Sequence, residues 1–193
     1  MATLNKFGVP MGGGNGRGGL LQLKYGYRFR VRVVNFGPIA GGMELTQQVE
    51  SVSKPNIDTD EIEVNSYNSK AWFAGKHTWG TIDLVVKDDI TNAVSTLVGH
   101  QMQKQLNHFE QTGFVSGTNY KFVTLIEVMD GGNDVVLEAW TLEGCWLKSV
   151  DYGDMNYSQS EYQTITMTIR FDNATQADGL MTLLPERIAG VMI

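Results

Sequence analysis

The sequence has little cysteine and little charge, and each shortage excludes a class of protein. Its single cysteine, Cys145, cannot form an internal disulfide or a cysteine-based metal cage, so a reducing compartment is expected. Charged residues make up 19% of the chain, below the typical value of about 25%. With 15 Lys and Arg against 21 Asp and Glu, the net charge is −6. That balance argues against a protein whose main task is to neutralise nucleic-acid phosphates.

Long apolar runs are missing as well. No run approaches the roughly 18 to 20 residues needed to cross a bilayer, and the N-terminus lacks the pattern of a signal peptide. We therefore expect a soluble protein that is made where it stays. The 193 residues correspond to one domain with its own core. Glycine is abundant, with 22 residues, and gathers in the segment 11–19, whose sequence is MGGGNGRGG.

Alternation of apolar and polar residues with a period of two dominates the chain after residue 24. It is clearest where Phe29, Val31 and Val33 share one face and Arg30 and Arg32 the other. This period is typical of half-buried strands. Strands are predicted at Tyr25–Val33, Met43–Ser53, Glu61–Tyr67, Thr78–Lys87, Tyr120–Met129, Asp134–Thr141 and Tyr162–Phe171.

One segment has helical periodicity, at about residues 89–112. Apolar residues and Gln101 recur there at intervals of three to four, from Ile90 to Phe109. Asp88 and Asp89 precede them as expected N-terminal caps, and Gly113 is a plausible stop. We therefore predict a mainly β fold, an antiparallel β-sandwich or barrel with one flanking α-helix. The expected organisation is a flexible Gly-rich arm at 1–24, a β domain at 25–174 and an apolar arm at 175–193.

The sequence contains no recognisable motif for catalysis, a cofactor or a metal. The Gly-rich segment has no preceding strand and no following Lys-Ser or Lys-Thr pair, so it does not match a phosphate-binding loop. The three histidines have no i, i+4 pairing for zinc. Acidic runs at 58–61 and 130–134 do not follow the EF-hand pattern and are interpreted as solvated turns. Cys145 is interpreted as an apolar filler. No enzyme activity, cofactor, metal or catalytic residue is predicted.

Arginines and tryptophans are the remaining candidates for binding. Arg28, Arg30 and Arg32 form a row on one strand face, which could contact nucleic acid. The alternative, favoured by the negative net charge, is that they pair with carboxylates of the same or a neighbouring subunit. The four tryptophans are expected to be core or interface anchors. They are Trp72, Trp79, Trp140 and Trp146.

Two stretches carry a family resemblance. The first is residues 79–89 (WGTIDLVVKDD) followed by the predicted helix. The second contains LEGCW at 142–146, VDYGDMNY at 150–157 and the strand that ends in RFDNA at 170–174. Both stretches resemble tail tube proteins of contractile-tailed bacteriophages. The resemblance covers about residues 25–174. Membership implies six-membered rings that stack into a hollow tube within a sheath. Tube proteins of bacterial secretion systems share that fold.

The resemblance also implies partners and a location. The chain would contact copies of itself, a sheath protein, and baseplate and terminator proteins at the tube ends. It would be made in the host cytoplasm and end in the virion, with DNA passing through the lumen without specific binding and no membrane contact. A tube initiator or baseplate relative of the same fold, and a nucleic-acid-binding β module that uses the arginine row, remain alternatives.

Overall fold

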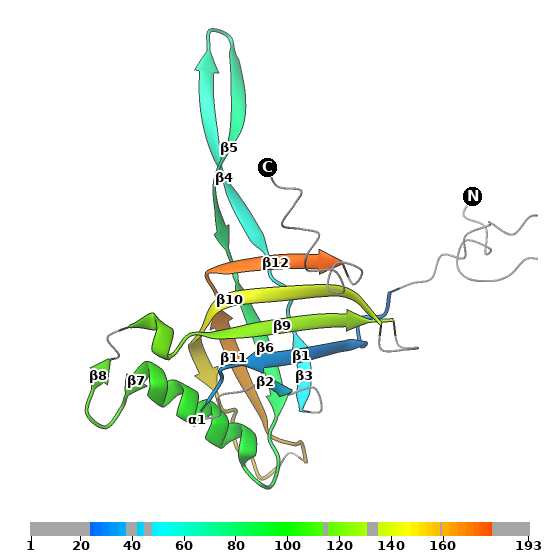
Figure 1. Cartoon of the computed structure of the whole chain (residues 1–193), viewed down its shortest axis with the longest axis vertical. Coiled ribbons are helices and arrows are strands. Elements are labelled where there is room, and N and C mark those ends of the chain that lie inside the picture. Colours follow the sequence, from blue (N-terminus) through cyan, green and yellow to red (C-terminus); the bar gives the residue numbers. More distant parts are fainter. Residues whose placement is uncertain are drawn as a thin grey trace, which may run out of the picture.

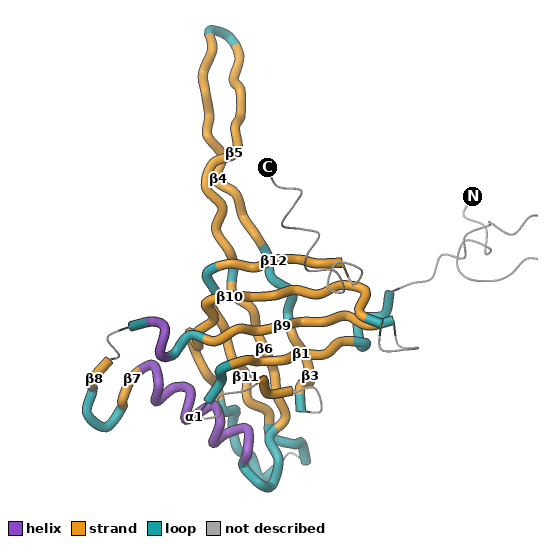
Figure 2. Tube along the Cα trace, viewed as in Figure 1, coloured by secondary structure: helices purple, strands orange, loops and turns teal. Residues whose placement is uncertain are grey.

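The computed structural model describes residues 24–37, 42–44, 48–113, 116–130, 135–158 and 160–178. Antiparallel strands dominate this part of the chain, and α1 (Ala93–Gln105) is the only α-helix in it (Figures 1 and 2). The strands are β1 (Phe29–Val34), β2 (Gly42–Glu44), β3 (Val49–Val52), β4 (Ile57–Ser66), β5 (Ser69–Trp79), β6 (Thr81–Lys87), β7 (Leu106–Asn107), β8 (Thr112–Gly113), β9 (Phe122–Met129), β10 (Val136–Asp151), β11 (Thr164–Arg170) and β12 (Asn173–Asp178).

The strands form two layers that share β10. The first sheet has the order β2-β1-β9-β10-β12, and the second has the order β10-β11-β6-β3. In Figure 1 the strands of the first sheet run across those of the second. The described part of the chain is thus an open sandwich with a flanking helix, which confirms the predicted fold class and decides between the sandwich and the closed barrel.

Strand β10 joins the layers because it bends near Gly144. Before the bend its residues pair with β9 and β12, and from Trp146 onward they pair with β11. Gly144 has a φ of 68°, a conformation that glycine adopts without strain. A Cβ atom there would lie 2.2 Å from Oδ2 of Asp172. A side chain at this position would therefore strain the backbone and require the Asp172 side chain to move.

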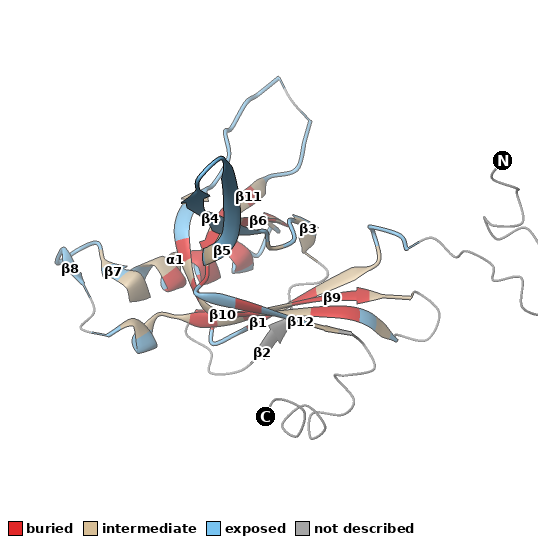
Figure 3. Ribbon diagram, turned by 90° about the horizontal axis from the view of Figure 1, so that it is seen from above, coloured by how far each residue is buried: buried red, intermediate tan, exposed pale blue. Residues whose placement is uncertain are grey.

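The core lies between the two sheets and under α1. Alternate residues of the strands point into it, as the period-two pattern predicted, and α1 contributes one apolar face. Figure 3 shows buried residues, in red, on strands of both sheets and on α1. The most enclosed members include Val31, Leu84, Val98, Phe122, Ile126, Leu142, Cys145, Leu147, Met167 and Ile169.

The helix is shorter than the predicted 89–112. It begins after Asn92, and Asp89 accepts a hydrogen bond from Thr91 Oγ1 at 2.7 Å, which lowers the pKa of Asp89. It ends at Gln105 because β7 and β8 then form a small hairpin. The side chain of Gln105 bonds both the N–H and the C=O of Leu147, at 2.8 and 2.9 Å. Phe109, expected on the buried face, is 95% exposed in this hairpin.

Several strands also differ from the prediction. The strand expected at Met43–Ser53 is interrupted, and its two parts, β2 and β3, lie in different sheets. Most of strand β5 (all but Thr78 and Trp79) and the second half of β10 were not predicted. Strand β12 continues the first sheet past residue 174 by pairing with β10 as far as Asp178. Residues 1–23 and 179–193 of the expected arms lie outside the described residues.

No helix in the described part is long and apolar enough to span a membrane.

Candidate assembly surface

The β4–β5 hairpin projects from the sandwich, as Figures 1 and 2 show. All ten residues of β4 are exposed, as are most residues of β5. The hairpin is anchored at its base, where Trp79 packs against Phe171 with ring centroids 5.7 Å apart. Beyond that base, its side chains face solvent on both sides.

The outer part of the hairpin has one apolar face and one polar face. Cross-strand pairing places Ile62 opposite Phe73 and Val64 opposite Ala71, and paired residues share a face. Ile62, Val64 and Phe73 are 52%, 46% and 59% exposed. We call these four residues the hairpin apolar face.

The opposite face carries charge. Glu63 and Lys70 form an ion pair there at 2.6 Å, next to the exposed Trp72. A two-stranded hairpin is marginally stable by itself. Contiguous exposed apolar side chains rimmed by polar ones mark interaction surfaces. The hairpin therefore has the properties of a segment that is completed by another macromolecule.

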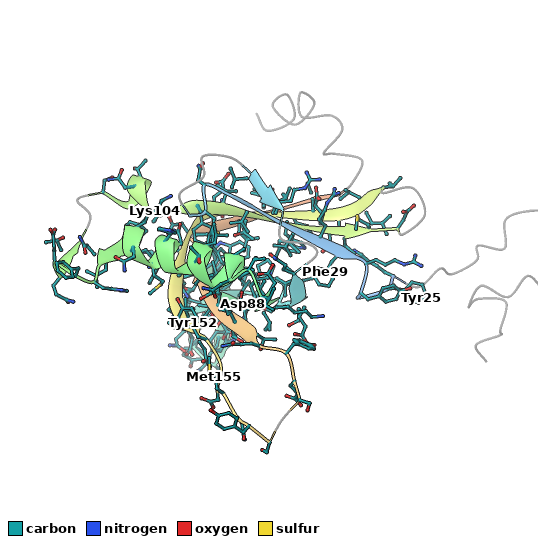
Figure 4. The ribbon with its side chains drawn as sticks, turned by 90° about the horizontal axis from the view of Figure 1, so that it is seen from below. Tyr25, Phe29, Asp88, Lys104, Tyr152 and Met155 are labelled. Carbon is teal, nitrogen blue, oxygen red and sulfur yellow. The ribbon has the colours of Figure 1, made fainter. Side chains whose placement is uncertain are left out.

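A second exposed group of large side chains lies in the loop between β10 and β11. Met155, Tyr157 and Tyr162 are 86%, 112% and 60% exposed. Figure 4 shows Tyr152 and Met155 on the side of the molecule where this loop extends from the sheet. Part of this loop carries the VDYGDMNY stretch that the sequence singled out, so the resemblance there lies in an exposed connection and not in the core.

The acidic run at 58–61 was interpreted as a solvated turn, and that interpretation is wrong. These residues belong to β4. Successive side chains of a strand point to opposite faces, so the adjacent carboxylates of Asp60 and Glu61 point away from each other and the run does not converge on one point. Among the described residues there is no group of three or more His, Cys, Asp or Glu side chains that could hold a metal ion.

The arginine row lies on the outer face of the first sheet, opposite the buried Val31 and Val33. Arg30 Nε lies 2.7 Å from Oε2 of Glu127, and Arg32 Nε lies 3.7 Å from the same oxygen. Glu127 is only 8% exposed. The predicted pairing with carboxylates is therefore confirmed for Arg30 and Arg32, and it occurs within one chain.

Arg28 has different partners. Its guanidinium lies 4.9 Å from the ring centroid of Tyr25 and 5.4 Å from that of Tyr27, and it donates a hydrogen bond to the carbonyl of Asp130. Cation–π contacts and ion pairs already engage this row. The three arginines thus make structural contacts within the single chain, which argues against the hypothesis that they bind nucleic acid.

The remaining candidates are mostly core residues. Cys145 is fully buried, and burial raises the pKa of its thiol to about 11, so the thiolate form is disfavoured. This confirms the interpretation of Cys145 as a filler. Trp79 and Trp140 pack against the core, and Trp72 is exposed on the hairpin. The sequence reasoning missed the hairpin apolar face, because β5 has no period-two alternation.

No protein-family model and no curated protein matches this sequence. Solved structures do match, and they define a class: the chain has a tail-tube-like fold. A chain of the anti-feeding prophage baseplate, a structure symmetrised six-fold, has a TM-score of 0.60 at 14% identity, covering 82% of this chain and 97% of that one. A chain of the sheath–tube complex of the extracellular contractile injection system PVC has a TM-score of 0.60 at 14% identity, covering 81% and 92%. The SPP1 tail tube has a TM-score of 0.51 at 10% identity, covering 86% of each chain.

Proposed function

We propose that this chain is a structural subunit that polymerises as stacked hexameric rings into the hollow inner tube of a contractile tail, through which DNA passes. The observation that carries the proposal is the hairpin apolar face, an exposed surface on a projecting two-stranded element. The tail-tube-like fold supports it, and the six-fold symmetry of the baseplate match supports the hexamer.

The geometry suits this role. A ring needs a surface that contacts a different surface on the next copy, and stacking needs a second such pair. The hairpin and the loop between β10 and β11 are separate exposed surfaces that offer large apolar side chains. The net charge of −6 supports passage of DNA without tight binding, because the electrostatic affinity for phosphates comes from Lys and Arg.

A tube initiator at the baseplate, or a cap, is the second candidate role. It is favoured by the matches to the anti-feeding prophage baseplate and to that particle's tube-terminating cap, the latter with a TM-score of 0.61 at 16% identity, covering 81% of this chain and 92% of that one. Single rings that do not stack on their own distinguish this role from that of the main tube. The sheath, baseplate and terminator proteins are the proposed partners in either case.

The test is electron microscopy and sedimentation of the purified chain beside two hairpin variants. We expect six-membered rings or tubes from the parent protein, and loss of assembly in Phe73→Asp with native circular dichroism. Asn65→Asp, which adds the same charge to the polar face of the hairpin, is the matched control and should still assemble. A monomeric parent protein that binds oligonucleotides with a steep salt dependence would contradict the proposal and favour the nucleic-acid-binding alternative.

A further inference from the structure

The open edge of the sandwich contains a cavity of about 490 Å³. Its walls come from both sheets: Phe29 of β1 and Ile126 and Val128 of β9 on one side, and Ser51 and Val52 of β3 on the other. Figure 4 shows Phe29 and Tyr25 near one end of the first sheet, where the cavity lies. The volume falls within the range of about 300 to 1,000 Å³ that is typical of ligand pockets.

Glu138 is held in place beside this cavity. Lys54, which lines the cavity, donates to its two oxygens at 2.9 and 3.1 Å, and Lys24 and the indole of Trp140 donate as well. Glu138 is 8% exposed. Burial opposes its ionisation, but the hydrogen bonds from Lys24, Lys54 and Trp140 outweigh that effect and lower the pKa of Glu138 to about 2. The rim is therefore polar, with Lys24 and Lys54 paired to Glu138, whereas Phe29, Val52, Ile126 and Val128 give the cavity apolar walls.

The described chain ends next to this rim. Asp178, the last residue of β12, pairs with Glu138 of β10. Strand β12 is separated from β9 by β10 alone, so the end of β12 lies about 10 Å from the cavity wall. The sequence that follows, residues 180–193 (LMTLLPERIAGVMI), is predominantly apolar. Five extended residues span about 17 Å, which is enough to bring Leu183 and Leu184 to the cavity.

We propose that this cavity is the docking site for the apolar C-terminal segment, residues 180–193, of the same chain. The proposal does not depend on tube formation. Covalent attachment a few residues away gives the segment a high effective concentration at the cavity, and burying apolar side chains there removes an exposed apolar tail from solvent. The N-terminal residues 1–23 also lead to the rim at Lys24 and include Leu20, Leu21 and Leu23. The Gly-rich stretch before these leucines has few apolar side chains and a high ordering cost, whereas residues 180–193 are apolar over a longer run.

The test uses an environment-sensitive fluorophore attached to Ser51→Cys, an exposed position on the cavity wall. Cys145 is buried with a raised thiol pKa, so the introduced cysteine is labelled selectively. In the full-length chain we expect blue-shifted emission and protection from iodide quenching. Leu183→Asp combined with Leu184→Asp should shift the emission to the red and raise quenching several-fold. Thr182→Asp is the matched control and should behave as the parent.

Two further measurements control this test. A label at Ser69→Cys, the first residue of β5 at the tip of the hairpin, should respond to none of these changes, and near-ultraviolet circular dichroism should stay native. A label at position 51 that is equally exposed in every variant overturns the proposal. So does protection that rises with protein concentration, which would show a second copy as the occupant, or protection that is lost on removing residues 1–23 instead. Failure to form tubes leaves all of these readouts unchanged.

Discussion

Oε1 of Gln101 in α1 accepts a hydrogen bond from the backbone N–H of Gly37, 3.0 Å away, in the buried interior. The same side chain donates from Nε2 to the carbonyl of Tyr120 at 2.7 Å. Gln101 is 0% exposed. One amide therefore ties the helix to the segment that follows β1 and to the segment that precedes β9, and it explains why a polar residue occupies the apolar face of the helix.

Replacing this amide should destabilise the subunit. Gln101→Leu keeps a similar volume but leaves the Gly37 N–H and the Tyr120 carbonyl without partners. Because a buried unsatisfied group costs about 1 to 3 kcal/mol, we expect a loss of at least that size in the free energy of unfolding. Urea unfolding followed by circular dichroism measures it. Gln103→Leu, at an exposed position of the same helix, should stay within about 0.5 kcal/mol, and equal effects of the two variants would contradict the structural role of Gln101.

Glu138 should make stability depend on acid pH. Its pKa is about 2 in the folded chain against an ordinary value of 4.5, so the folded state binds fewer protons than the unfolded state between these values. The stabilisation is complete above about pH 4.5 and disappears as the pH falls toward 2. Glu138→Gln should therefore cost about 1.5 to 3 kcal/mol at pH 7 and progressively less in acid.

Urea unfolding at pH 7, 4 and 2.5 measures this dependence. Glu143→Gln, at an exposed position of the same strand, is the control and should behave as the parent. A difference between the parent and Glu138→Gln that is constant over this pH range would show that the carboxylate contacts do not produce it.

A side chain at position 144 should destabilise the fold. Gly144→Ala places a Cβ against Asp172 and forces a left-handed backbone conformation on alanine, so a loss of about 1 to 3 kcal/mol in the free energy of unfolding is expected. Gly99→Ala is the opposite case. Gly99 lies inside α1 with nothing within 4 Å of an added Cβ, and alanine there should add about 0.5 to 1 kcal/mol. Thermal unfolding of both variants checks the pair, and a neutral Gly144→Ala would contradict this account of the bend.

Local periodicity predicted the parts of this fold that obey a simple rule. In β11, Ile165, Met167 and Ile169 alternate with polar residues, and burial follows the alternation. The same holds for Val31 and Val33 of β1. These strands lie with one face on the core and the other toward solvent, so the sequence carries their period directly.

Only one strand of the β4–β5 hairpin was predicted in this way: the strand expected at Glu61–Tyr67 overlaps β4, whereas most of β5 was missed. Both faces of the hairpin are exposed in the single chain, so no core imposes a period, and residues 72–75 (WFAG) read as neither strand nor helix. The C-terminal end of the helix, at Gln105, was also not predicted. The apolar period continues to Phe109, but the bonds from Gln105 to Leu147, 42 residues away, mark the end of the helix and the start of the β7–β8 hairpin.

The sequence by itself therefore determined the strand-rich class, the single helix and the absence of recognisable catalytic motifs, because these depend on neighbours along the chain. Only the tertiary structure decided how the long strand β10 divides between two sheets, and that Glu138 meets Lys24 and Lys54, 114 and 84 residues away. It also decided that the arginine row meets Glu127. Such contacts depend on which strands become neighbours. The order of strands is set when the apolar faces of all strands and of the helix are buried together, and no local sequence pattern specifies it.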